Sequence, residues 1–183
     1  MAKIVILVGS PMEKTRLNGI VEYVRSKVAE AGIKPSLIAV RDLPAEDLLH
    51  ARFDSEAIQA ANREVEQADA VIVATPVFKA SFPGVLKAYI DLLPQKGFQN
   101  KVVLPIAIGG TIAHLLSIDF AMKPVLSTMG PRNLLAGVFV QDAQVVWNDD
   151  GTADIAEEAA SRLDESVRLL LQETALQSSN VKA

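Results

Sequence analysis

The fold is constrained most by an apolar strand that runs into a proline turn and then into a helix start. Residues 70–75 form a largely apolar run, Pro76 follows at once, and Pro83-Gly84 opens a segment in which apolar residues recur at helical spacing. A continuous apolar run of this length is typical of a parallel strand buried on both faces. Proline is tolerated in the first turn of a helix. The segment therefore predicts a loop at the carboxyl end of a parallel strand.

Two further strand ends carry loops of the same kind. One follows residues 3–8 and begins Gly9-Ser10-Pro11, and the other follows residues 101–108 and reads Gly109-Gly110-Thr111. In open α/β sheets, ligands bind in the crevice outside the carboxyl ends of the strands. Three such loops in one chain predict a ligand crevice at that edge.

Along the whole chain, short apolar runs alternate with longer segments of 3.6-residue period, which indicates parallel strands joined by crossover helices. Strands are expected over residues 3–8, 35–40, 70–75, 101–108 and 133–140. Helices are expected over residues 16–31, 55–67, 83–93, 112–129 and 154–175. The pattern predicts an α/β fold, a flavodoxin-like, doubly wound, five-stranded parallel sheet in the order 2-1-3-4-5 with helices on both faces. We expect residues 1–176 to form a single domain and residues 177–183 to be a disordered tail.

Composition excludes several classes of protein. The chain has no cysteine, which suits a cytoplasmic protein and removes both disulfides and a thiol nucleophile. Its net charge of -4 without basic clusters argues against nucleic-acid binding. Apolar runs are of strand length, so no membrane span is expected, and Gly9-Ser10-Pro11 interrupts the first run too early for a signal peptide.

Catalytic side chains are scarce. The two histidines are His50 and His114, and the sequence contains neither H-E-x-x-H nor G-x-S-x-G. We therefore expect no metal site and no catalytic acid, base or nucleophile. Hydride transfer through a bound cofactor would account for this scarcity, because the protein then mainly positions the reactants.

The first loop is neither a dinucleotide-binding G-x-G-x-x-G nor a P-loop. Ser10, Thr15, Arg16 and Asn18, together with the free N–H groups of a helix start, could instead hold one terminal phosphate. The alternative is that Thr15 caps the helix and Arg16 is solvated.

The other two loops offer an apolar wall and a glycine edge. Thr75 and Pro76 lead into Val77 and Phe78, against which a flat ring could lie, and Gly109-Gly110 lets a ligand approach the backbone closely. Ordinary turn chemistry could explain either loop alone. A mononucleotide flavin requires all three features together: a loop that binds its phosphate, an apolar wall for its ring, and glycines that let the ring edge approach the backbone.

These segments also carry a resemblance to a known family. The motifs are Gly9-Ser-Pro, Ala74-Thr-Pro-Val-Phe-Lys, Phe82-Pro-Gly-Val-Leu-Lys, Lys101-Val-Val-Leu-Pro, Gly109-Gly-Thr-Ile-Ala-His-Leu-Leu and residues 46–55. Over about residues 3 to 170 the chain resembles the NAD(P)H-dependent FMN reductases, most closely the reductase component of two-component alkanesulfonate monooxygenases.

The resemblance implies that FMN is a substrate or a loosely bound cofactor, reduced by NAD(P)H, with FMNH2 released to a partner flavin-dependent monooxygenase. It places the phosphate on Ser10, Thr15 and Arg16, and the ring on residues 75–78 and on Gly109, Gly110 and Thr111. Met12 departs from the family, where many relatives have arginine, and this leaves Arg16 as the expected phosphate cation.

Phe120 conflicts with the helix expected around it. An apolar stripe would form the core face, and Phe120 falls nearly opposite to it. The stripe comprises Leu115, Ile118, Met122, Val125, Leu126 and Met129. Phe120 is then an exposed aromatic, an interface residue, or the mark of a π-bulge. The resemblance implies a π-helical segment at a tetramer interface, with Ser117 and Asp119 as polar neighbours, and hence a homo-oligomer, either a dimer or a tetramer.

Three other functions remain open at this point. A quinone or azo-dye reductase with bound FMN would differ only in what receives the hydride. A flavodoxin-type electron carrier would use the same fold and loops. A purely structural domain would leave the three loops unexplained.

Overall fold

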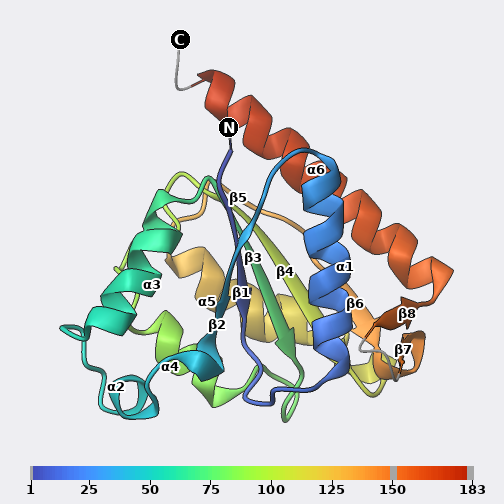
Figure 1. Ribbon diagram of the computed structural model, residues 1–183, viewed down its shortest axis with the longest axis horizontal. Coiled ribbons are helices and arrows are strands. Elements are labelled where there is room, and N and C mark those ends of the chain that lie inside the picture. Colours follow the sequence, from blue (N-terminus) through green and yellow to red (C-terminus); the bar gives the residue numbers. More distant parts are fainter. Residues whose placement is uncertain (1, 149–151, 181–183) are drawn as a thin grey trace.

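The computed structural model describes residues 2–148 and 152–180, and its centre is a six-stranded sheet (Figure 1). The strands are β1 (Ile4–Val8), β2 (Ser36–Ala39), β3 (Ala70–Pro76), β4 (Val102–Gly109), β5 (Asn133–Leu134) and β6 (Val138–Gln141). The order is β2-β1-β3-β4-β5, all pairs are parallel, and β6 also pairs with β4. The expected flavodoxin-like fold and strand order are confirmed.

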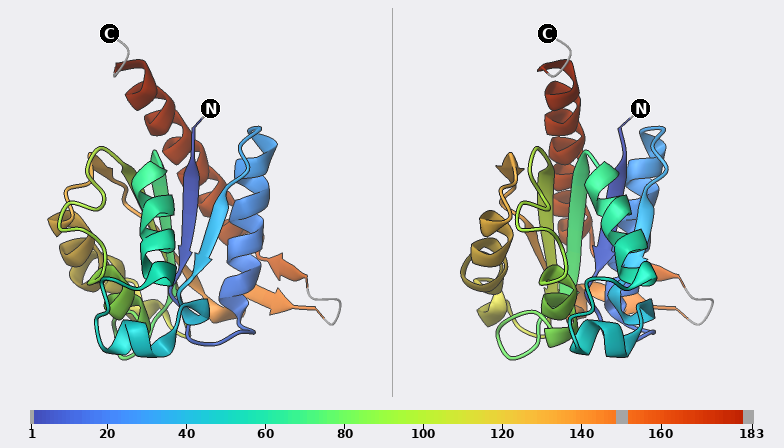
Figure 2. Two further views of the ribbon diagram at one scale, coloured as in Figure 1. Left: turned by 60° about the vertical axis from the view of Figure 1, so that its left-hand side comes forward. Right: turned by 90° about the vertical axis from the view of Figure 1, so that its left-hand side faces the viewer.

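Helices cover both faces of the sheet (Figure 2). On one face lie α1 (Arg16–Glu30) and α6 (Glu157–Asn180); on the other lie α3 (Glu56–Gln67), α4 (Gly84–Ile90) and α5 (Lys123–Thr128). Successive side chains of a strand point to opposite faces, so Ile4 and Ile6 join the α1 side while Val5 and Leu7 join the α3 side. Every residue of β1, β3 and β4 is buried, which explains their uninterrupted apolar sequences.

The last expected strand, residues 133–140, is divided into β5 and β6. The register of pairing with β4 changes by one residue between these two strands, because Leu134 pairs with Val103 but Val138 pairs with Ile106. Pro105 lies at the break and has no N–H with which to continue a ladder. Gly137 faces it at φ +89, and a Cβ on Gly137 would lie 2.7 Å from the Pro105 carbonyl oxygen. The proline in β4 and the glycine opposite it therefore produce a bulge-like step.

The expected helix over residues 112–129 is a succession of three helix types. A 3₁₀ turn η2 (Ile112–His114) is followed by a π-helix η3 (Ile118–Met122), which leads directly into α5. The π-bulge interpretation of Phe120 is confirmed, and Phe120 itself is 77% exposed. Leu115 was expected on the core face but is 43% exposed, because the 3₁₀ turn before it changes the angular register.

Several short elements have no counterpart in the expectations. They are η1 (Val40–Asp42), α2 (Ala45–Leu49), η4 (Asp142–Gln144), β7 (Val145–Trp147) and β8 (Ala153–Ile155). The β7–β8 pair is an antiparallel hairpin that projects beside α1 (Figure 2). Residues 154–155 were expected to be helical, but they pair with β7, and α6 begins at Glu157.

The carboxyl terminus also differs from expectation. Helix α6 continues to Asn180, so residues 177–180 are helical rather than part of a disordered tail, and Gln177 is buried. Residues 181–183 lie outside the described part of the chain. Among the helices of that part, none is both long and apolar enough to cross a membrane.

We predict that Gly137→Ala lowers the free energy of unfolding by about 2 kcal/mol, because alanine is strained at positive φ and its Cβ would collide with the Pro105 carbonyl. Gly84→Ala is the matched control, since a Cβ there meets nothing within 4 Å and the residue begins a helix. Urea unfolding of both variants measures the difference. Equal stability of the two variants would contradict the proposed cause of the step between β5 and β6.

Candidate functional site

A pocket of about 300 Å³ lies at the carboxyl ends of β1, β3 and β4. Its lining comprises Met12, Lys14, Thr15, Arg16, Leu17, Pro76, Val77, Phe78, Ile108, Gly109, Gly110 and Asp142. All three predicted loops therefore meet in one cavity. Of the predicted site residues, Thr15, Arg16, Pro76, Val77, Phe78, Gly109 and Gly110 line it. Ser10, Thr75 and Thr111 lie outside the lining.

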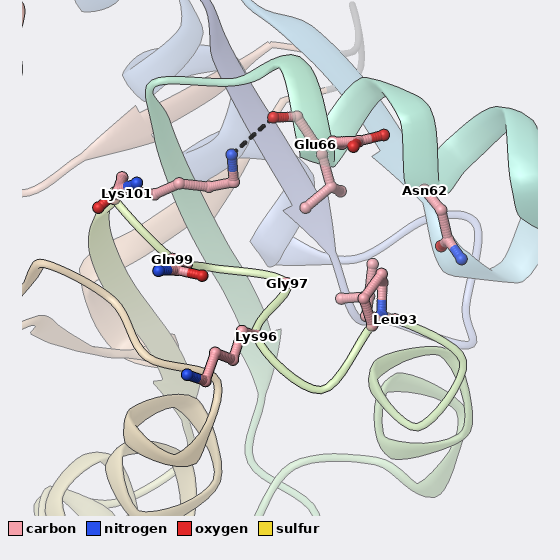
Figure 3. Close-up of a pocket in the computed structure, with 10 residues that line it drawn as sticks. Asn62, Glu66, Leu93, Lys96, Gly97, Gln99 and Lys101 are labelled. Carbon is pink, nitrogen blue, oxygen red and sulfur yellow. Dashed lines mark hydrogen bonds between the residues drawn. The ribbon is translucent and has the colours of Figure 1, made fainter.

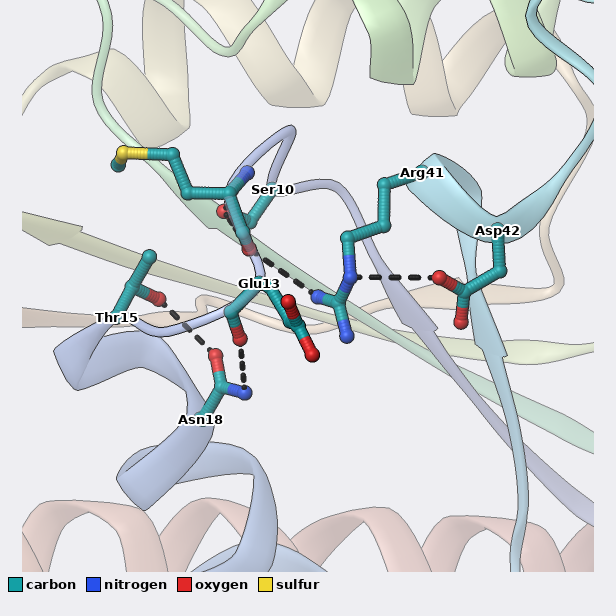
Figure 4. A network of polar contacts seen from close by, with 7 residues as sticks. Ser10, Glu13, Thr15, Asn18, Arg41 and Asp42 are labelled. Atoms are coloured by element: carbon teal, nitrogen blue, oxygen red, sulfur yellow. Dashed lines mark hydrogen bonds and ion pairs between the residues drawn. The ribbon is translucent and has the colours of Figure 1, made fainter.

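The first loop is shaped by hydrogen bonds to its own backbone (Figure 4). Ser10 is fully buried; its Oγ accepts from the Met12 N–H at 3.1 Å and donates to the Met12 carbonyl oxygen at 3.2 Å. Arg41, in the turn η1 that follows β2, donates from Nη1 to the same carbonyl at 3.2 Å and pairs with Asp42 at 3.4 Å. The Ser10 hydroxyl therefore braces the loop from within.

Asn18 fixes the second half of this loop (Figure 4). Its Nδ2 donates to the Glu13 carbonyl at 2.9 Å, and its Oδ1 accepts from the Thr15 hydroxyl at 3.1 Å. Thr15 occupies the N-cap position of α1, but its side chain makes no capping hydrogen bond. The helix start keeps its positive dipole end toward the pocket, without an acidic residue in the first turn. Arg16 and Lys14 add two cations to this end of the lining.

The second loop is a tight turn that holds the apolar wall. Phe78 and Ser81 exchange two backbone hydrogen bonds, of 2.7 and 3.0 Å, with Lys79 and Ala80 at positive φ between them. The Val77 N–H donates to the Ile108 carbonyl at 2.7 Å, which ties the wall to β4. Val77 and Phe78 are thereby held in a fixed position beside the pocket.

The Thr75 hydroxyl is buried in β3 and donates to the Pro76 carbonyl at 3.1 Å. Like the Ser10 hydroxyl, it hydrogen-bonds to a backbone carbonyl and does not line the cavity. Thr111 lies beyond the lining as well, and its Oγ1 caps η2 by accepting from the Ala113 N–H.

The two glycines have different roles. A Cβ on Gly109 would lie 3.3 Å from Val77 Cβ and 3.3 Å from Phe139 Cζ, so a side chain there would press on both neighbours. A Cβ on Gly110 would meet only Asp142 Oδ2, at 3.6 Å, so its open side faces the pocket. Gly110 is the position where a ligand can approach the backbone closely.

Lys14 and Asp142 are the charged lining residues that the sequence interpretation missed. Lys14 stands next to Thr15, and its position before a helix start was a usable signal. Asp142 follows β6 directly and could have been found by the same carboxyl-end rule that located the other loops. Asp142 stands two residues after the expected end of that strand, residue 140.

A second cavity, of about 240 Å³, lies at the opposite edge of the sheet, where β4 begins (Figure 3). Lys101 borders it and donates from Nζ to the carbonyls of Glu66 and Ala68, at 2.7 and 2.8 Å, which caps the end of α3. Burial lowers the pKa of Lys101. A larger hollow of about 500 Å³ opens between α4 and α5. Neither lies at the carboxyl ends of the strands.

The histidines stand apart from the pocket lining: His50 ends α2, and His114 lies in η2. Within residues 2–148 and 152–180, no three histidine, aspartate or glutamate side chains gather as a group that could hold a metal ion.

Comparison with known proteins identifies the family of the chain. Residues 2–147 match the family of NADPH-dependent FMN reductases. The chain is 45% identical to the FMN reductase (NADPH) of Pseudomonas putida KT2440 over 166 residues, which cover 90% of this chain and 84% of the relative. It is 45% identical to the FMN reductase (NADPH) of Escherichia coli K12 over 144 residues, or 79% of this chain and 75% of that one.

A solved structure, the apo form of the NADH:FMN oxidoreductase EmoB, superposes with a TM-score of 0.83 at 32% identity. The superposition covers 93% of this chain and 88% of EmoB. Sequence and architecture agree over nearly the whole described chain, and the chain belongs to the NADPH-dependent FMN reductase family.

Proposed function

We propose that this protein reduces FMN with NADPH and that FMN binds in the pocket formed by the three loops. The supporting observation is that one cavity combines a cationic end, an apolar wall and an open glycine edge. These are the groups that suit a phosphate, a flat ring and the polar rim of that ring, respectively. The family and the two relatives named for NADPH favour that nucleotide over NADH.

In this proposal each part of the pocket has one task. The start of α1, with Arg16 and Lys14, binds the phosphate, because an anion is stabilised by cations and by the positive end of a helix dipole. Ser10 and Thr15 hold the loop in shape. Val77 and Phe78 orient the ring and exclude water from one side of it.

Bound FMN would supply the hydride-accepting chemistry that the side chains of this pocket lack. The chain positions the reactants, and no side chain has to donate a proton while the hydride moves. The backbone N–H of Gly110, which lines the pocket, would stabilise negative charge at the ring edge, as donors do in an oxyanion hole.

We further propose that the product is released as FMNH2 to a flavin-dependent monooxygenase of the alkanesulfonate type. Arg16 and Lys14 are exposed to solvent, so the phosphate end of the pocket is open, as exchange of a flavin substrate requires. The family motifs around Gly9, Phe82 and Gly109 support the same partner class. A cytoplasmic location agrees with a chain that has no cysteine.

The π-helical segment supports the proposal of a homo-oligomer. Phe120 in η3, and Ile112 and Leu116 before it, are large apolar side chains exposed to solvent. Asp119 pairs with Lys123 at 2.6 Å, one helical turn further on. The buried Ser117 Oγ has no hydrogen-bond partner among the described residues. An apolar patch with polar neighbours is typical of a protein–protein interface.

Arg16→Ala tests the phosphate site. We expect FMN affinity to fall about tenfold, since a hydrogen bond to a charged group contributes about 1.5 kcal/mol or more. Riboflavin lacks the phosphate and should bind as it does to the wild type. Quenching of flavin fluorescence measures both dissociation constants.

Arg25→Ala is the matched control, because Arg25 is an exposed arginine further along α1, paired with Glu22. Arg16 Nε also donates to the Val145 carbonyl at 3.1 Å, so its removal could disturb the neighbouring turn. Equal weakening of FMN and riboflavin would indicate that structural effect and would contradict the phosphate role.

Phe120→Ala tests the oligomer. If Phe120 lies in an interface, its truncation should weaken self-association about tenfold or more, because buried aromatic anchors dominate interface energies. Sedimentation velocity gives the assembly state. Phe53→Ala, at an exposed phenylalanine outside the π-helical segment, is the control. Wild-type assembly in Phe120→Ala would make this side chain an incidental surface aromatic.

A further inference from the structure

The carboxylate of Asp142 occupies a position in the pocket that neither the phosphate loop nor the ring wall accounts for. Asp142 is the first residue of η4, directly after β6, and it is half-buried. Its Oδ2 lies 3.6 Å from the point where a Cβ on Gly110 would stand. The carboxylate therefore stands beside the glycine edge that is open to a ligand.

The backbone around Asp142 is held in place from both sides. Gln141 and Gln144 form a capping box, in which the Gln141 N–H donates to Gln144 Oε1 at 3.0 Å. Arg162 of α6 donates to the same Oε1 at 3.3 Å and to the Phe139 carbonyl at 2.8 Å. The main chain that carries Asp142 is thus fixed before any ligand arrives.

Two arginines reach this turn, yet neither neutralises the carboxylate. Arg162 is bound to a carbonyl and an amide oxygen, and Arg16 Nε donates to the Val145 carbonyl. In the described part of the chain, the Asp142 carboxylate has neither a hydrogen bond nor an ion pair. A half-buried carboxylate left without a donor in a preorganised pocket is suited to accept a hydrogen bond from a ligand.

The chemistry and position of this group restrict what the ligand donor can be. An ionised carboxylate only accepts hydrogen bonds, so it selects O–H or N–H groups and repels a phosphate. Arg16, at the cationic end, donates to the carbonyl of Val145, three residues after Asp142, and the Asp142 carboxylate itself lies beside Gly110. Asp142 is therefore linked to both ends, along the chain to the residue that Arg16 binds and through space to Gly110. A flavin with its phosphate at one end and its ring at the other has its ribityl chain in between.

We propose that Asp142 is a specificity-determining residue that accepts a hydrogen bond from a hydroxyl of the ribityl chain. This inference rests on the proposed function, since it assumes that the pocket binds FMN. It assigns the carboxylate a role in selecting flavins that carry a polyol.

The test uses three oxidised flavins, whose binding is measured by fluorescence quenching without nucleotide. FMN has a phosphate and a ribityl chain, riboflavin has the ribityl chain alone, and lumiflavin has a methyl group in its place. For Asp142→Ala we expect riboflavin affinity to fall about tenfold, the effect of losing a hydrogen bond to a charged group, and lumiflavin affinity to stay unchanged. FMN should follow riboflavin or lose slightly less, because removing the carboxylate also removes its repulsion of the phosphate.

Two further variants show whether a change in flavin affinity comes from loss of the hydrogen bond to Asp142. Asp142→Asn keeps an acceptor oxygen and should retain more riboflavin affinity than Asp142→Ala. Glu165→Ala removes one exposed carboxylate from α6, outside the pocket lining, and should leave all three affinities unchanged. Circular dichroism of each variant reports its fold. If Asp142→Ala does not fold, the comparison of riboflavin with lumiflavin in Asp142→Asn decides the matter.

Each alternative result overturns the inference in a recognisable way. Equal loss for all three flavins would mean that Asp142 contacts the ring or only shapes the turn. Unchanged riboflavin binding would mean that the carboxylate is merely solvated. If the wild-type protein itself fails to bind FMN, the proposed function falls; if it binds FMN and Asp142→Ala binds riboflavin equally well, only the role of Asp142 falls.

Discussion

The pairing of β3 between β1 and β4 determines where this chain can bind a ligand. The Gly9 N–H donates to the Ala74 carbonyl at 2.8 Å, and the Val77 N–H donates to the Ile108 carbonyl at 2.7 Å. These bonds extend the ladders beyond the strands and draw the three loops to one point. The chain passes from β1 to β2 on one side of β1 and then returns to β3 on the other side. The strand order therefore reverses between β1 and β3, close to the point where the loops meet. The position of the pocket is therefore set by the order and pairing of the strands.

Within the pocket, hydroxyl and charged side chains have separate tasks. The Ser10 and Thr75 hydroxyls are buried and hydrogen-bonded to backbone, so they give the loops their shape. Lys14 and Asp142 line the cavity and carry opposite charges. A preorganised backbone, with charged groups that have no partner among the described residues, can bind a polar ligand without reorganising.

The sequence predicted best those features that depend on burial. Strands β1, β3 and β4 are buried on both faces, so their apolar runs located them and the loops that follow them. The position of Phe120 off the apolar stripe indicated a π-bulge as one of three explanations, and the π-helix η3 confirms that one. Both signals are local and strong.

Features that depend on contacts between distant segments were not predictable in the same way. The step between β5 and β6 arises where Gly137 meets Pro105 on the neighbouring strand, and the β8 strand forms only because β7 lies opposite it. The exact end of β6 is likewise set by its pairing with β4, although Asp142, which follows it, lies where the carboxyl-end rule places a loop. The role of Ser10 as a brace likewise depends on loop geometry that its sequence position does not reveal.

The central claim is that FMN binds where the three loops meet, and a crystal structure of the protein with FMN tests it most directly. Our account predicts the phosphate at the start of α1 within hydrogen-bonding distance of Arg16, and the ring against Val77 and Phe78 beside Gly110. FMN bound instead in the cavity beside Lys101, or between α4 and α5, would contradict the account.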